Sequence, residues 1–189
     1  MKLLRAYIAV IDRLNYGVGR VIMYGIFAMM AVLLWSTISK FSDQPSLWTL
    51  EVAQFAMITY FFLGGPYAIQ MGAHVRMDLF YENWSVKKKA AVDAIMVFCL
   101  IFYLGVLLWG GLSSTAYSLG HFGSNPVGFF VDLATGEKEV GTLERSRTIW
   151  RPYLWPIKTI MCIGILLMLL QALSELCKDI LRLKGEDVA

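Results

Sequence analysis

Long apolar blocks with almost no charged residues are the feature that most restricts what this chain can fold into. Four such blocks occur, each long enough to cross about 30 Å of hydrocarbon as a helix. They run from about residue 21 to 41, 48 to 72, 90 to 119 and 156 to 176. Because lipid offers no partners for backbone polar groups, such blocks are expected to be helical. We therefore predict an all-α integral membrane protein with four transmembrane helices, in a single domain covering residues 1–189.

The first 20 residues predict an amphipathic helix that precedes the first span. Apolar side chains repeat at helical spacing, and the charged side chains are expected mostly on the opposite side. These charged residues are Lys2, Arg5, Asp12 and Arg13. We interpret residues 1–20 as a helix lying in the membrane interface; a solvent-exposed lead into the first span is an open alternative. The segment lacks the apolar centre and small-residue cleavage site of a signal peptide, so we expect none to be cleaved.

Basic residues are distributed unevenly between the two sides of the predicted membrane domain. The N-terminal segment, residues 73–89 and the C-terminal tail together carry eleven Lys and Arg residues. The other two loops carry five, or six when Lys158 is included. Because cytoplasmic loops are the basic ones, we expect both termini and residues 73–89 in the cytoplasm. The long loop 120–155 is then periplasmic.

A glycine pair and a proline, Gly64-Gly65-Pro66, occur within the second apolar block. Proline has no backbone donor and clashes with the preceding turn, so we expect a kink in this helix. A charged cluster follows, formed by His74, Arg76 and Asp78. Their spacing by two residues would direct all three side chains to one side of an extended segment. We hypothesise that the cluster fixes the cytoplasmic end of the span; an ordinary charged loop is the open alternative.

Tryptophans and one acid mark the outer ends of two spans. Trp48 is expected at the membrane interface, and Glu51 follows one helical turn later. An acid so close to hydrocarbon must be paired, hydrated or protonated. We expect its carboxylate to reach the outer headgroups, and a proton or ion site is the alternative. Before the fourth span, Trp150, Pro152 and Trp155 are typical of an interfacial aromatic belt joined to a helix start.

Several classes of chemistry lack the residues they need. No phosphate-binding loop motif occurs, and the two histidines, His74 and His121, are expected on opposite sides of the membrane. They could not ligate one haem or metal together, which disfavours a redox subunit. The three cysteines form no Cys-x-x-Cys motif, and we expect no disulfide. We therefore expect no enzyme activity and no cofactor or metal in this chain. The net charge of +3 is small, so we also expect no nucleic-acid partner.

Three short motifs occur in order along the chain. They are Trp48-x-x-Glu51, Gly64-Gly65-x-Tyr67-Ala68 and His74-Val75-Arg76-Met77-Asp78. The four-span layout and the later Trp150-x-Pro152-x-x-Trp155-Pro156-x-Lys158 cluster accompany them. Together these features resemble the small membrane (DctQ-like) subunit of tripartite ATP-independent periplasmic (TRAP) transporters, over nearly the whole chain.

The resemblance implies an accessory role in the bacterial inner membrane. In such systems a periplasmic solute-binding protein delivers an organic acid or similar small solute to a large multi-span permease subunit. That large subunit carries the substrate and sodium sites and moves by an elevator mechanism. This chain would be a single small-permease domain that packs beside it as a scaffold, among membrane lipids and without a substrate site of its own. The residues named above would then serve structure or partner contact.

One rival function is that of a complete transporter instead of an accessory subunit. A self-sufficient, dimeric, proton-coupled exporter would use Glu51 as its coupling residue. The position of Glu51, one turn from Trp48, is too shallow for a central transport site.

Overall fold

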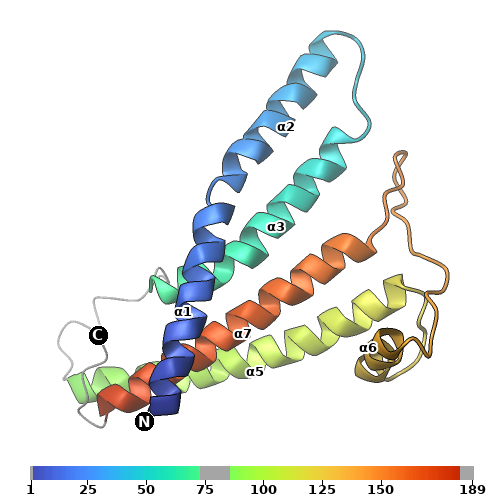
Figure 1. Ribbon diagram of the computed structural model, residues 1–189. Coiled ribbons are helices and arrows are strands. Elements are labelled where there is room, and N and C mark those ends of the chain that lie inside the picture. Colours follow the sequence, from blue (N-terminus) through green and yellow to red (C-terminus); the bar gives the residue numbers. More distant parts are fainter. Residues whose placement is uncertain (1, 73–85, 184–189) are drawn as a thin grey trace.

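Figure 1 shows the computed structural model, which describes residues 2–72 and 86–183. The helices are α1 (Lys2–Ile22), α2 (Gly25–Phe41), α3 (Thr49–Gln70), α5 (Val86–Ser118), α6 (Pro126–Thr135) and α7 (Trp155–Leu183). Within these ranges, four segments are long and apolar enough to cross a membrane. They are Leu4–Phe41, Thr49–Gln70, Ile95–Ser118 and Trp155–Leu181. The prediction of a four-span, all-α chain is confirmed.

Helices α1 and α2 follow one another across a two-residue turn at Met23 and Tyr24. Together they form an apolar segment of 38 residues. Such a segment is about 57 Å long as a helix, well beyond the hydrocarbon core of about 30 Å. The N-terminal segment is thus helical as predicted, and it continues almost directly into the first span. Figure 1 shows α1 crossing α7 close to the C-terminal end of α7, whereas α2 lies mainly along α3.

Helices α3, α7 and α5 form the packed centre of the molecule. The core residues Leu104, Ile165 and Ala172 lie between α5 and α7, with Phe62 of α3 against them. Gly65 of α3 lies close against α7: a Cβ there would come within 2.6 Å of the Met168 sulfur. Small residues allow helices in lipid to approach in this way, because dispersion contacts then extend along both backbones.

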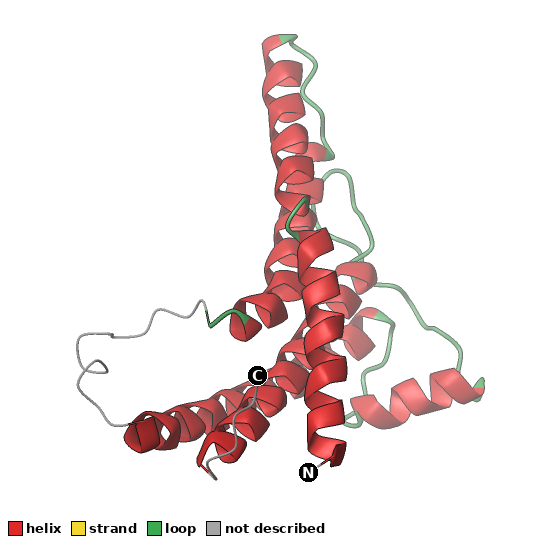
Figure 2. Ribbon diagram, turned by 60° about the vertical axis from the view of Figure 1, so that its left-hand side comes forward, coloured by secondary structure: helices red, strands yellow, loops and turns green. Residues whose placement is uncertain are grey.

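Residues 120–155 differ from the prediction of a long loop because they contain the helix α6. The Asn125 side chain accepts a hydrogen bond from the Gly128 N–H at 3.1 Å and caps the helix start. Gly136 ends the helix in the left-handed conformation, at φ 78°. Phe129 packs with Ala116 and Leu119 from the end of α5, so α6 is held against the bundle. Figure 2 shows α6 as a short helix set to one side of the long helices.

Candidate functional site

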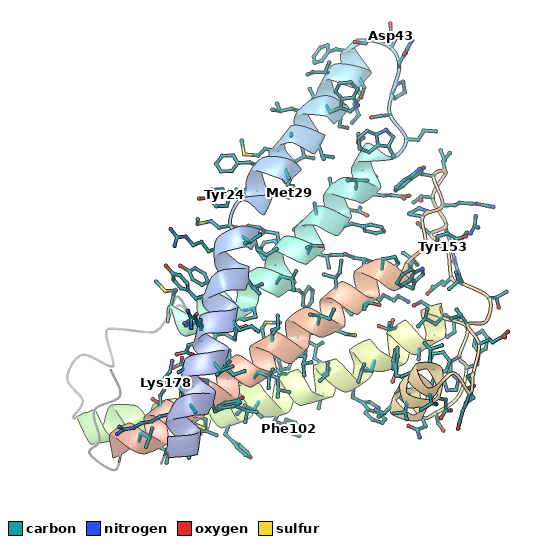
Figure 3. All side chains as sticks on the ribbon, in the orientation of Figure 1. Tyr24, Met29, Asp43, Phe102, Tyr153 and Lys178 are labelled. Atoms are coloured by element: carbon teal, nitrogen blue, oxygen red, sulfur yellow. The ribbon has the colours of Figure 1, made fainter. Side chains whose placement is uncertain are left out.

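The most polar buried region lies where α1, α3 and α7 meet. We call it the polar junction, and it is formed by Asp12, Asn15, Gln70, Gln171, Ser174, Glu175 and Lys178. Lys178, labelled in Figure 3, lies at the crossing of α1 and α7. Its ammonium group is 2.7 Å from Asp12 Oδ2 and 2.7 Å from Glu175 Oε1. One lysine thus holds two carboxylates, one on each helix.

Asp12 is the centre of the polar junction. Its Oδ1 accepts hydrogen bonds from Gln171 Nε2 at 2.9 Å and from Ser174 Oγ at 3.2 Å. Its backbone carbonyl accepts a third from Gln70 Nε2 at 3.1 Å. The three helices are therefore joined at one residue. This contradicts the expectation that Asp12 lies on the polar side of α1, away from the packed face.

Asn15 lies one turn after Asp12 and is 1% exposed. Its Nδ2 donates to Gln171 Oε1 at 2.7 Å. Two amide oxygens, Asn15 Oδ1 and Gln70 Oε1, are buried without a hydrogen-bond partner in the described part of the chain. The polar junction thus holds the helices together, and its carboxylates already accept hydrogen bonds from neighbouring donors. The two amide oxygens are acceptors that could still take a hydrogen bond.

The polar junction had a sequence signal that the expectations above did not use. Gln171, Ser174, Glu175 and Lys178 follow one another at intervals of three, one and three residues, across the end of the fourth apolar block. This spacing places them on one face of a helix. A polar face so near the hydrocarbon requires partners, and Asp12 and Asn15 are the residues that supply them.

At the other end of α7, Lys158 ties residues 120–155 to the bundle. Its Nζ is 2.7 Å from Glu144 Oε2 and donates to the Ser114 carbonyl at 3.2 Å. The backbone N–H of Glu144 donates to the Ser118 carbonyl at 3.0 Å. The end of α5, residue 144 and the start of α7 are thereby held together.

The predicted tryptophan–proline cluster lies beside this ion pair. Trp155 begins α7, as predicted from the Trp-Pro sequence, and both Trp150 and Trp155 are exposed. Pro152 lies in a hairpin, where its carbonyl accepts from the Ser146 N–H at 2.9 Å. An isolated bridge between Arg145 and Tyr153 closes that hairpin.

Glu51 is not where the sequence led us to expect it. Trp48 is partly exposed at the N-terminus of α3, as expected for an interfacial residue, but Glu51 is only 4% exposed. Neither of its carboxylate oxygens has a hydrogen-bond partner among the described residues. The carboxylate therefore points into the protein and does not reach outward past Trp48.

Gly64, Gly65 and Pro66 form a contact region within an unbroken helix. α3 continues to Gln70, so the backbone does not unwind at the proline. Pro66 is fully buried, and Gly64 and Gly65 face Ile22 of α1 and Met168 of α7. The remaining predicted cluster, His74, Arg76 and Asp78, lies outside the described residues.

The described ranges contain no group of three or more His, Cys, Asp and Glu side chains that could hold a metal ion. A shallow groove of about 320 Å³ runs along α5 and borders α7 at Met161. It is lined by Tyr103, Val106, Leu107, Gly110, Gly111, Ser114 and Met161. Such a lining offers few polar groups with which to orient a charged solute.

A search against protein families matched residues 29–182 to "Tripartite ATP-independent periplasmic transporters, DctQ component". The match contains α3, α5 and α6, most of α2 and nearly all of α7, and it begins after α1. No curated protein and no solved structure matched the chain. The four-span fold and the match over most of the length agree with the resemblance seen in the motifs. The chain belongs to the DctQ family, the small membrane components of TRAP transporters.

Proposed function

We propose that this chain is the scaffold subunit of a TRAP-type secondary transporter in the bacterial inner membrane. It packs against a large, sodium-coupled elevator permease that takes up an organic acid or a similar small solute. A periplasmic binding protein delivers that solute, and both termini of this chain lie in the cytoplasm. Membership of the DctQ family, whose members are transporter components and not enzymes, supports this proposal.

The observation that carries the scaffold role is the apolar surface of α2. This helix, all of which is described, has no buried residue. Phe27 is 65% exposed, Leu34 61% and Phe41 88%. Within the chain α2 packs mainly on α3, so most of its circumference is available to lipid or to helices of another subunit. An apolar helix with so little internal packing is suited to hold a partner in the membrane.

Substrate and sodium sites are assigned to the large subunit. The groove on α5 is apolar apart from Tyr103 and Ser114, and carboxylate recognition requires donors or positive charge. Partner contact is proposed for the ends of the spans, at Trp48, Trp150 and Trp155. His74, Arg76 and Asp78 are proposed to anchor the cytoplasmic end of the second span.

The test is co-purification of the large subunit with a tagged form of this chain after co-expression. Phe27→Ala combined with Leu34→Ala removes apolar surface from α2. Phe98→Ala combined with Phe102→Ala removes a comparable exposed surface from α5, where these side chains are 67% and 71% exposed. We expect the α2 variant to lower the yield of large subunit and the α5 variant to leave it unchanged. The reverse result would move the contact to α5, and no co-purification with the unaltered chain would refute the scaffold role.

The proton-coupled exporter remains a second candidate because of one observation. Glu51 is a buried acid without a partner in the described chain, as a proton-carrying residue can be. This candidate requires activity without other subunits. The chain alone, reconstituted in vesicles with an imposed proton gradient, should drive solute exchange that Glu51→Gln abolishes. The scaffold proposal expects no exchange from either form.

A further inference from the structure

The side of α1 that faces away from the bundle carries two arginines among apolar side chains. We call it the outer face of α1 and define it by Val10, Arg13, Arg20, Val21 and, just past the helix end, Tyr24. All five residues are exposed. The scaffold role proposed above does not use this face.

The polar junction fixes which side of α1 faces outward. Asp12 and Asn15 are held against α7, and Gly19 lies against Tyr67 of α3. Arg13 and Arg20 are seven residues apart, which is about two turns or 10 Å along a helix, so both lie on the same side. That side is directed away from α3 and α7, and rotating it inward would break the Asp12–Lys178 ion pair.

Neither guanidinium group has a counter-charge within the described part of the chain. Among residues 2–72 and 86–183, no acid pairs with Arg13 or Arg20, and both side chains are exposed. Lys178, by contrast, forms ion pairs with two carboxylates. The two arginines are therefore available to bind anions from outside the chain.

Both arginines lie at the expected edge of the first span. The first apolar block begins immediately after Arg20, and Tyr24 lies in the turn that leads into α2 (Figure 3). Arg13 then lies about 10 Å further out, within the headgroup layer that surrounds the hydrocarbon core. Val10 is 63% exposed, Val21 71% and Tyr24 60%, so apolar side chains flank both charges. Arginines interleaved with apolar residues on one helix face are typical of a helix seated on a membrane surface.

We propose that the outer face of α1 binds the phosphates of anionic lipid headgroups in the leaflet nearest the termini. Arginine suits this role because its planar fork donates two parallel hydrogen bonds to phosphate oxygens. The apolar neighbours favour a lipid surface over an acidic segment of a soluble partner. This inference is independent of the scaffold proposal, since it concerns a helix outside the family match.

The test is lipid binding by the purified full-length chain in detergent micelles, measured by native mass spectrometry. Phosphatidylglycerol and phosphatidylcholine with identical acyl chains are titrated separately. We expect the unaltered chain to bind phosphatidylglycerol more tightly. Arg13→Gln with Arg20→Gln should weaken phosphatidylglycerol binding by roughly tenfold or more, and leave phosphatidylcholine binding unchanged. Equal binding of phosphatidylglycerol by this variant and the unaltered chain would overturn the proposal.

Three controls identify the cause. Arg147→Gln with Arg151→Gln removes the same charge from exposed positions in the hairpin before α7 and should keep the preference. Arg13→Lys with Arg20→Lys retains the charge and should keep most of the preference for phosphatidylglycerol. A loss of preference as large as in the glutamine variant would contradict a charge-based site. Inorganic phosphate at matched concentration should not displace the lipid, and full displacement would identify a free-anion site instead. If the double glutamine variant does not fold, Arg13→Gln alone should lose part of the affinity for phosphatidylglycerol. Unchanged affinity in that single variant would again overturn the proposal.

Discussion

Gly164 of α7 lies directly against the backbone carbonyl of Phe62 in α3. A Cβ at Gly164 would come within 2.6 Å of that oxygen. Pro66, four residues after Phe62, has no N–H with which to complete the helical hydrogen bond to the same carbonyl. The proline therefore leaves a polar atom in the apolar centre of the molecule, and α7 covers it with a glycine backbone.

Gly164→Ala should destabilise the protein by about 1–3 kcal/mol, because a backbone atom cannot move aside as a side chain can. The matched control is Gly110→Ala on α5, where an added Cβ would meet nothing within 4 Å. The control should be neutral or slightly stabilising, since alanine favours a helix by about 1 kcal/mol over glycine. Thermal unfolding in detergent measures both. Equal midpoints for the two variants would mean that α3 and α7 are not in close contact at Phe62.

Lys178→Met should destabilise the polar junction, because it leaves the Asp12 and Glu175 carboxylates without their shared cation. We expect a loss of about 1–3 kcal/mol, below the range for fully buried pairs because the Asp12 side chain is 23% exposed. Asp12→Asn with Lys178→Met should cost less than the sum of the single changes. Lys138→Met, which breaks an ion pair with a 49% exposed lysine, is the control and should cost at most about 1 kcal/mol. Additive losses in the double variant would show that the pair is not coupled.

Lys158→Met should loosen residues 120–155, because the Lys158 ammonium group joins the Glu144 carboxylate to the Ser114 carbonyl. Limited proteolysis of this region should become several-fold faster while the helices remain intact. Glu144→Gln keeps a hydrogen-bond acceptor for Lys158 and should have a smaller effect. Cleavage at the rate of the unaltered chain in Lys158→Met would mean that other contacts hold this segment.

Hydropathy could predict the four spans because lipid imposes the same demand on each of them. It could not predict the orientation of α1, where one apolar stripe and one polar stripe both occur. Counting Asp12 as a solvent-facing charge was wrong because α7 offers Gln171, Ser174 and Lys178 at the matching depth. That partnership joins residues more than 150 positions apart, and no local pattern contains it.

The helix α6 was missed for a different reason. Asn125, Pro126 and Gly136 are residue types typical of turns, but a capping residue, a proline at the first helical position and a glycine past the end also delimit a helix. Only the packing of Phe129 on the end of α5 decides between the two interpretations. The prediction for Glu51 failed because the nearby Trp48 indicates how far along the span the residue lies. It does not indicate whether the carboxylate points toward the protein or away from it.

Cysteine labelling should establish the orientation of the chain, which we predict from its eleven basic residues on one side against five on the other. In a background without native cysteines, an impermeant reagent added to intact cells should modify Gly136→Cys. It should modify Lys88→Cys only after the membrane is opened. Labelling of Lys88→Cys in intact cells would reverse the topology and place the outer face of α1 at the periplasmic leaflet.

The measurement that tests the scaffold proposal most directly is solute uptake by vesicles that contain defined combinations of subunits. With the large permease, the binding protein and this chain together, we expect sodium-dependent uptake. Omitting this chain should abolish or strongly reduce that uptake, and this chain alone should transport nothing. Full uptake without this chain, or transport by this chain alone, would contradict the account.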